Sequence, residues 1–195
     1  MKLLEYLDQP VVGDYVPAAF LNNFEEMDDL AVSDEESRII AALRQLTEED
    51  CMEHGVILFN GVQYGDFIQG TKSAVPLPQS SLPCGGQISL FHSHSNSAPP
   101  SVADLRYFCA ENVDKICAVA YNGDIFLVEL GDGERPDAAE FEAVSQQIDY
   151  DVNMEIMFDA SAPDWTEDER NYRAMRESFF RICRHFKWTM RGGRL

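Results

Sequence analysis

Two histidines and an aspartate near the middle of this 195-residue chain have the residue types and the spacing of metal ligands. One residue separates His92 from His94, so in a β-strand both imidazoles would point to the same face. Asp104 lies one helical turn after Ser101, where the chain beyond a pair of prolines is expected to begin a helix. Two imidazoles and one carboxylate leave the fourth position of a tetrahedral zinc ion open, which is typical of catalytic zinc sites rather than structural ones.

Structural explanations compete with this chemistry at each position. Ser101 and Asp104 form an S-x-x-D pattern, which alone is typical of a helix cap. A lone histidine is most often a structural residue, but two that face one point beside an aspartate favour a ligand role. Of the other histidines, His54 alternates to the opposite strand face and His185 is expected on a helix surface, so neither is predicted to bind metal.

The elements that would position these residues follow from local patterns. Ser33 and Glu36 form a capping box that opens a helix. The Asn-Gly and Asn-Gly-Asp sequences at 60–61 and 122–124 are hairpin turns between apolar runs. The expected helices cover 33–46, 101–112, 138–157 and 166–188, and the expected strands cover 56–59, 62–68, 87–94, 116–121 and 125–130, with 74–77 continuing the sheet. This order predicts a mixed α+β domain around one curved sheet.

A family resemblance emerges from the complete motif. The H-x-H of His92 and His94, followed by the S-x-x-D of Ser101 and Asp104, resembles the JAMM motif of the MPN/JAB metalloproteases. That family also has a glutamate upstream, and Glu53 stands in its place between a helix and a hairpin. The resemblance covers residues 34–131 and implies an MPN/JAB-like (cytidine-deaminase-like) curved mixed sheet flanked by helices.

Two departures from the family pattern are visible. Ser95 follows the second histidine, where the family usually has proline. The spacer between His94 and Ser101 has six residues, one fewer than in the commonest form. A changed loop of this kind would affect the position of the third ligand or the shape of the substrate groove.

The resemblance implies a role for each residue. His92, His94 and Asp104 would hold one Zn²⁺ per chain. Glu53 would be the general base, which takes a proton from water and passes it to the departing amine; alone, a glutamate is most often a solvated carboxylate. Ser101 would donate to the oxyanion of the tetrahedral intermediate. The bond cleaved would be an amide in a protein or peptide, most often an isopeptide between a ubiquitin-like C-terminus and a lysine.

Two other functions are consistent with the same motif. A catalytically inactive MPN scaffold would bind a partner through this fold, although inactive relatives usually lack the ligands. A nucleic-acid factor like the bacterial RadC group shares the motif in an H-N-H-P-S-G form that is absent here. The chain carries a net charge of −19, with +6 in residues 169–195 and −25 in the remainder, and an acidic body argues against nucleic acid as a partner.

The two ends of the chain lie outside the resemblance. Residues 1–32 are expected to be an irregular arm before a core at 33–134, and 135–195 a helical extension that packs on this core. The helix at 166–188 has an apolar stripe for core packing and a basic remainder, which could also bind a protein partner. The sequence from Arg191 to Leu195 is interpreted as a frayed tail.

Location and redox state are inferred from what the sequence lacks. The start of the chain has no apolar run of signal-peptide length, and no segment approaches the roughly 20 apolar residues of a membrane span. The five cysteines form no C-x-x-C pair. We therefore expect a cytoplasmic protein with reduced core thiols, in which Cys84 is the most exposed.

Overall fold

In the computed structural model of the protein, residues 27–77, 83, 85–110, 112–133, 135–159 and 164–194 are described. Most of the expected N-terminal arm and Cys84 therefore lie outside the described residues. The described chain forms one seven-stranded mixed sheet in the order β1-β7-β6-β5-β4-β2-β3. Its strands are β1 (Asp28–Asp29), β2 (His54–Phe59), β3 (Val62–Gln69), β4 (Ile88–His94), β5 (Val113–Ala120), β6 (Ile125–Glu129) and β7 (Thr189–Gly193).

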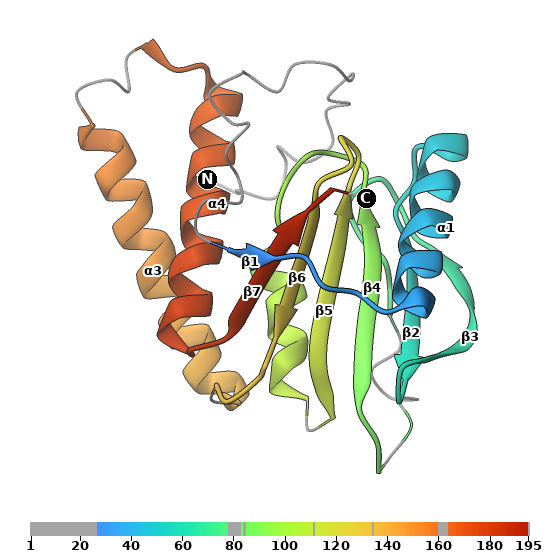
Figure 1. Ribbon diagram of the computed structural model, residues 1–195. Coiled ribbons are helices and arrows are strands. Elements are labelled where there is room, and N and C mark those ends of the chain that lie inside the picture. Colours follow the sequence, from blue (N-terminus) through green and yellow to red (C-terminus); the bar gives the residue numbers. More distant parts are fainter. Residues whose placement is uncertain are drawn as a thin grey trace.

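Helices cover both faces of this sheet (Figure 1). They are α1 (Asp34–Asp50), α2 (Val102–Leu105) with the 3₁₀ helix Arg106–Cys109, α3 (Ala138–Phe158) and α4 (Glu167–His185). Along β4, Leu90 packs into the cluster on the α3 and α4 face, whereas its neighbour Phe91 packs into the cluster under α1. The period-2 alternation of a strand therefore assigns β4 side chains to two cores. The expectation of an α+β fold with a helix-flanked mixed sheet is confirmed.

The predicted capping box opens α1. Ser33 Oγ accepts the backbone N–H of Glu36 at 3.2 Å, and the Glu36 carboxylate accepts the backbone N–H of Ser33 at 2.7 Å. Ile39, Ile40 and Leu43 then bury one helix face against the sheet. The helix continues to Asp50, four residues beyond the expected end, and stops where Cys51 adopts a left-handed conformation.

Both predicted hairpins are present. Asn60 and Gly61 have positive φ angles of 51° and 78°, which a tight turn between β2 and β3 requires. The prediction that 74–77 continues the sheet is wrong, because this segment is irregular and lies against the sheet face. An added Cβ on Gly55 would come within 2.7 Å of Val75 Cγ1 and 3.0 Å of Leu77 Cδ2, so the glycine makes room for this segment.

The predicted helix at 101–112 is much shorter than expected. Regular α-helix ends at Leu105, and the 3₁₀ helix ends before Ala110, which is extended. The Arg135 guanidinium donates to the carbonyls of Phe108, Ala110 and Val113. These bonds satisfy the carbonyls that a continued helix would have used, and they allow the chain to enter β5 parallel to β4.

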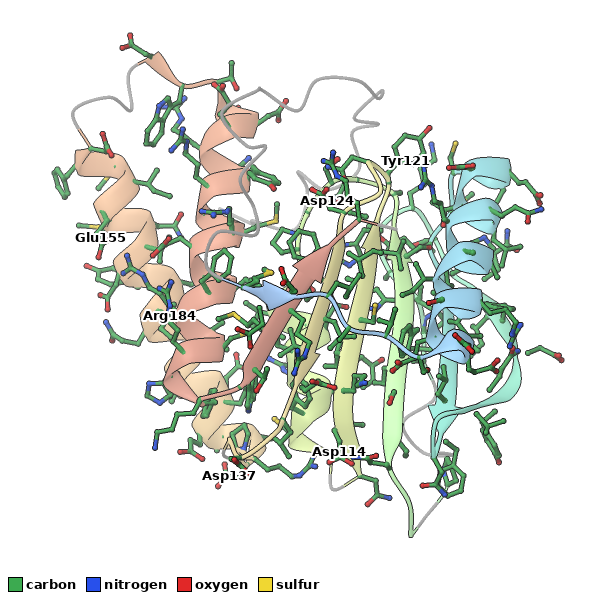
Figure 2. The ribbon with its side chains drawn as sticks, viewed as in Figure 1. Asp114, Tyr121, Asp124, Asp137, Glu155 and Arg184 are labelled. Atoms are coloured by element: carbon green, nitrogen blue, oxygen red, sulfur yellow. The ribbon has the colours of Figure 1, made fainter. Side chains whose placement is uncertain are left out.

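The C-terminal extension contains the two expected helices, and the predicted frayed tail is wrong. Residues 189–193 form β7, antiparallel to β6 and parallel to β1. Trp188 is 4% exposed and anchors this strand to the core. Arg194 binds Asp124 at 2.6 Å, at the end of the sheet opposite Asp114 (Figure 2).

None of the described helices is long and apolar enough to cross a membrane. Two of the four described cysteines, Cys117 and Cys183, are buried core thiols, and burial raises the pKa of both. Cys109 is half-buried. The expectation of core thiols is wrong for Cys51, which is exposed at the end of α1.

Candidate metal centre

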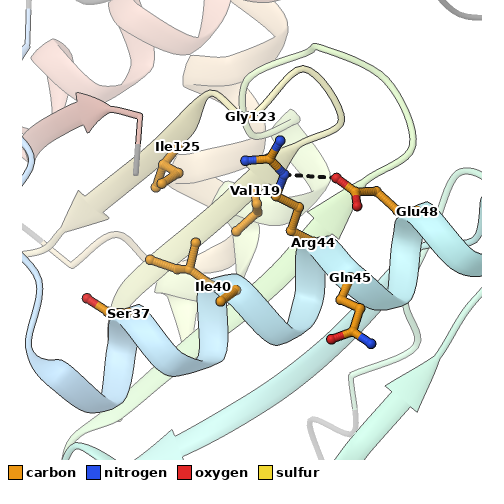
Figure 3. Close-up of a pocket in the computed structure, with 9 residues that line it drawn as sticks. Ser37, Ile40, Arg44, Gln45, Glu48, Val119, Gly123 and Ile125 are labelled. Atoms are coloured by element: carbon orange, nitrogen blue, oxygen red, sulfur yellow. Dashed lines mark hydrogen bonds and ion pairs between the residues drawn. The ribbon is translucent and has the colours of Figure 1, made fainter.

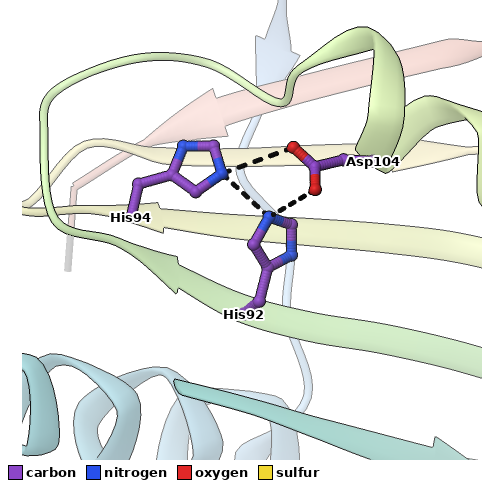
Figure 4. A group of neighbouring side chains, drawn as sticks. All are labelled: His92, His94 and Asp104. Atoms are coloured by element: carbon purple, nitrogen blue, oxygen red, sulfur yellow. Dashed lines mark hydrogen bonds and ion pairs between the residues drawn. The ribbon is translucent and has the colours of Figure 1, made fainter. Parts of the chain in front are cut away.

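Three side chains from the end of β4 and the start of α2 converge on one point (Figure 4). His92 Nε2 and His94 Nε2 lie 2.9 Å apart. The Asp104 carboxylate faces both rings, with Oδ1 at 3.3 Å from His92 Nε2 and Oδ2 at 3.4 Å from His94 Nε2. Both imidazoles are buried, whereas the Asp104 side chain is 21% exposed, so the cluster has an open side.

These atoms fit a divalent metal ion. Each residue offers one ligand atom, and the ligand atoms all lie within 4.8 Å of one another. In a tetrahedral zinc site with bonds of about 2.0–2.1 Å, neighbouring ligand atoms would be about 3.3 Å apart. The two imidazole nitrogens are 2.9 Å apart, and each has one Asp104 oxygen at 3.3 or 3.4 Å, so small adjustments would bring the three groups round one ion. The pair of nitrogens with one carboxylate oxygen is also a donor set that suits Zn²⁺.

Hydrogen bonds hold His94 in the orientation of a ligand. Its Nδ1 lies 2.9 Å from the Ala98 carbonyl. A carbonyl can only accept a hydrogen bond, so Nδ1 must carry the proton. Nε2 is then the atom left to bind a metal, an arrangement common among metal-binding histidines. Without a metal, burial opposes the charged imidazolium, but the hydrogen bond and charge of Asp104 prevail and raise the pKa of His94 to about 9.

The Asp104 carboxylate is held ionised at this site. Burial would raise its pKa, but the charges and hydrogen bonds of His92 and His94 hold it well below the usual value of 3.8. An ionised carboxylate that faces two imidazoles is ready to accept a cation. The cluster therefore combines a negative charge with two nitrogen ligands.

Ser101 caps α2 and orients Asp104. Its hydroxyl and its backbone N–H both donate to Asp104 Oδ2 at 2.7 Å, and the hydroxyl accepts the backbone N–H of Asp104 at 3.2 Å. The capping explanation of this S-x-x-D pattern is thus confirmed. The hydroxyl binds the same carboxylate oxygen that faces His94, so the cap also fixes the direction of the third ligand.

Glu53 lies beside the cluster without belonging to the ligand set. The residue is 6% exposed. Burial is the largest influence on its carboxyl and raises its pKa, while the charges of His94 and His92 and a hydrogen bond from the Ser95 backbone N–H act in the opposite direction. The interactions with both imidazoles place the carboxyl within electrostatic reach of the metal ligands.

Next to His92 and Asp104 is a small, mostly apolar cavity. Its lining includes Val75, Leu77 and Tyr107, and its volume is about 10 Å³, close to the lower limit for one water molecule. Tyr107 Oη donates to the Leu77 carbonyl at 3.3 Å and so ties the irregular segment after β3 to the helix that follows Asp104. This contact closes the wall of the cavity.

A larger groove lies on the other face of the sheet. It has a volume of about 240 Å³ and is lined by α1 and the β5–β6 end, including Ile40, Arg44 and Ile125 (Figure 3). Arg44 forms an ion pair with Glu48 at 2.9 Å at its rim. The sheet separates this groove from the histidine cluster, so it is not part of the candidate metal centre.

His54 points away from the cluster, as expected. Its Nε2 lies 3.0 Å from Asp50 Oδ2 on the other side of the strand. His185 is exposed on the last turn of α4, also as expected.

Sequence analysis missed three contributors to this site. The Ala98 carbonyl and the Ser95 N–H are main-chain groups of a loop, which side-chain patterns do not reveal. Ser93, between the two histidines, lies on the α1 face of β4, where its Oγ accepts hydrogen bonds from the Thr47 hydroxyl and from the backbone N–H of His54. A small hydroxyl at that position was the signal that could have identified it.

Comparisons with models of known families, with curated proteins and with solved structures gave no match. The resemblance of this chain to the JAMM metalloproteases therefore depends on its motif residues alone.

Proposed function

We propose that the protein is a zinc-dependent metallopeptidase of the JAMM type, which hydrolyses an isopeptide or peptide bond with Glu53 as its general base. The observation that supports this most strongly is the burial of the Glu53 carboxyl beside the converged His92, His94 and Asp104 ligands. A structural zinc site would have four protein ligands and no need for an adjacent base.

Each residue has a part in this proposal. Zinc, when bound, supplies Lewis acidity and lowers the pKa of water in its open position towards 7. The Glu53 carboxylate accepts the proton of the attacking water and delivers it to the departing amine nitrogen. Its raised pKa suits this role, because a base must also be able to act as an acid when it returns the proton.

Ser101 has two parts in the proposal, which its hydroxyl would take in turn. The hydroxyl orients Asp104 through the hydrogen bond at 2.7 Å, and the residue is exposed at the open side of the cluster. To donate to the oxyanion that develops on the substrate carbonyl oxygen, the hydroxyl would turn its one proton away from Asp104, whose Oδ2 would keep the bond from the Ser101 backbone N–H at 2.7 Å. Donors of this kind typically contribute about 10²–10³ in rate.

The substrate class follows from the resemblance to JAMM proteases. We propose a protein substrate, with the C-terminus of a ubiquitin-like protein joined to a lysine or a following residue. A protein partner through the basic face of α4 is a second proposal. On that helix Arg181 pairs with Glu155 and Glu177, whereas Arg170 and Arg184 are exposed on its surface.

The test is hydrolysis by zinc-loaded protein of a ubiquitin-like protein fused through its C-terminal glycine to a reporter. Wild-type protein is expected to cleave the fusion, and a chelator is expected to stop it. The Glu53→Gln variant should keep one zinc per chain but lose about 10²–10⁴ in rate, because the base is not a ligand. Asp50→Asn is the matched control, since its carboxylate lies on the other side of β2, and its rate should stay at the wild-type level.

Two outcomes would contradict the proposal. Full activity of Glu53→Gln would remove its role as base. Absence of cleavage of any fusion by protein that holds little zinc would favour the alternative, a catalytically inactive MPN scaffold. Metal analysis by mass spectrometry separates the two alternatives further, because a scaffold is expected to purify with well under one zinc per chain.

A further inference from the structure

The backbone hydrogen-bond ladder between β2 and β4, the two strands nearest the site, ends just before it reaches Glu53. The antiparallel β2–β4 ladder runs from the Phe59–Ile88 pair to the Gly55–His92 pair and ends there. Both strands continue beyond it, because β2 also includes His54 and β4 runs on to His94. The ladder therefore stops while regular backbone is still present on both sides.

A side chain replaces the backbone ladder at this point. Ser93 Oγ accepts the backbone N–H of His54 at 2.9 Å. It also accepts the hydroxyl of Thr47 in α1 at 2.5 Å and faces the His54 carbonyl at 3.5 Å. Ser93 and Thr47 are 1% and 2% exposed, so these bonds are shielded from competing water.

The main-chain groups of Glu53 bond the chain on the side opposite β4. Its N–H donates to the Thr71 carbonyl at 2.8 Å and its carbonyl accepts the N–H of Gly70 at 2.8 Å. Its side chain nevertheless returns to β4, where the Ser95 N–H binds the carboxylate. Glu53 thus spans a gap between the strands, and Ser93 marks the point at which that gap opens.

We infer that Ser93 is a positioning residue, whose hydroxyl wedges β2 and β4 apart and so sets the separation between the Glu53 carboxylate and the metal ligands. This inference rests on the proposed function, since the hydrolytic water and the scissile bond would lie in the gap between Glu53 and the metal ligands. A backbone ladder extended by one more pair would draw Glu53 towards His94 and narrow the gap. A frayed strand end would let the carboxylate move away.

The first arm of the test follows amide hydrogen exchange at His54 in the metal-free protein. Ser93→Ala removes the acceptor of this N–H and should raise its exchange rate about tenfold, as expected for the loss of one buried hydrogen bond. Ser93→Thr keeps a hydroxyl and should restore protection. Ser89→Ala is the matched control, because Ser89 lies on the same strand and the same face, four residues upstream at the Leu58 pair.

The second arm distinguishes positioning from a general structural role. Co²⁺ affinity is measured by optical titration for the wild type, Ser93→Ala, Glu53→Gln and the double variant. Ser93→Ala should weaken Co²⁺ binding about tenfold, because the Glu53 charge that Ser93 holds beside the ligands would move away from the ion. In the Glu53→Gln background the same change should have no further effect, because the residue that Ser93 positions has lost its charge.

Each outcome is decisive. Unchanged His54 exchange in Ser93→Ala, or an equal loss of Co²⁺ affinity in both backgrounds, overturns the inference and leaves Ser93 a structural residue. Non-additive losses support it. These readouts need no substrate, so Co²⁺ binding without any hydrolysis would refute the proposed function alone, whereas the absence of Co²⁺ binding would refute both.

Discussion

Two capping boxes in this protein present a carboxylate to a buried or partly buried partner, and they differ in how the charge is balanced. At the start of α1, the Ser33–Glu36 box directs Glu36 to Lys115 at 2.8 Å. At the start of α2, the Ser101–Asp104 box directs Asp104 to two imidazoles. The local motif is the same, but the first carboxylate meets a permanent cation and the second does not.

The first cluster is complete without any ligand. Lys115 Nζ lies 2.8 Å from Glu36 and 2.9 Å from Glu129, and Arg191 adds a second cation at 3.2 Å from Glu129. Two carboxylates thus meet two cations. A partly buried arrangement that satisfies its own charges has a structural role as its simplest explanation.

The second cluster lacks a permanent cation. Asp104 and Glu53 supply two carboxyl groups, and the two histidines can supply positive charge only by taking up protons. Their Nε2 atoms face each other at 2.9 Å. Only one proton fits between the two nitrogens, so one Nε2 can donate a hydrogen bond to the other, but both cannot be protonated towards each other. The comparison shows why one capping box marks a fold-stabilising pair and the other a site that favours a divalent ion.

The largest difference is expected when each cluster loses its central charge. Asp104→Ala removes a ligand, so zinc binding should fall by more than the roughly 10–100-fold that loss of a supporting partner costs. The stability gained from zinc should fall with it, because metal-binding free energy adds to folding free energy. Lys115→Met should leave zinc affinity unchanged but destabilise the protein by about 2–3 kcal/mol, since two carboxylates lose their shared partner.

Isothermal titration with zinc and urea unfolding measure these two effects on both variants. Equal zinc affinity in Asp104→Ala and the wild type would show that Asp104 is not a ligand. A loss of zinc binding in Lys115→Met would show that the two clusters are not independent.

In the metal-free protein, the first cluster is expected to lose its contribution to stability as pH falls, and the second as pH rises. Burial raises the pKa of Glu36 and of Glu129, but their bonds to Lys115 prevail and lower both pKa values, so their contribution is present above pH 4.5 and lost as pH falls. His94 has its pKa raised from 6.5 to about 9, so its contribution is complete below pH 6.5 and lost as pH rises to about 9. The loss for His94 should be about 3 kcal/mol.

Urea unfolding of metal-free protein between pH 6 and 9 measures this loss. Zinc should reverse the trend, because it competes with the proton on His94 and its apparent affinity rises with pH up to about 9. The Asp104→Ala variant is the control, since without the carboxylate the pKa of His94 loses the largest influences that raise it, and the alkaline loss should shrink. A metal-free stability that is flat over this range would contradict the assignment.

The parts of the structure that local chemistry determines could be predicted from the sequence. Asn60 and Gly61 form the turn that their φ preferences require, and Ser33 caps α1 as its spacing to Glu36 indicates. Strand alternation alone predicts that His92 and His94 share a face. The convergence of Asp104 with this pair follows from the short connection between β4 and α2.

The parts that depend on distant partners could not be predicted. Gly192 and Gly193 have low strand propensity, and β7 exists because β6 and β1 supply hydrogen bonds on both sides. The helix after Ser101 is short because Arg135, far along the chain, captures the carbonyls at its end. No local pattern contains either interaction.

The smallest effect is expected from removing the serine of each capping box. Ser33→Ala and Ser101→Ala should each cost about 1 kcal/mol of stability, the usual value for a lost N-cap. Only Ser101→Ala should also weaken zinc binding, by about tenfold, because its hydroxyl orients the carboxylate oxygen that faces His94. Ser101→Thr keeps the hydroxyl and should restore affinity. If Ser33→Ala and Ser101→Ala weaken zinc binding equally, the effect comes from helix stability, and the cap of α2 has no separate role in presenting the ligand.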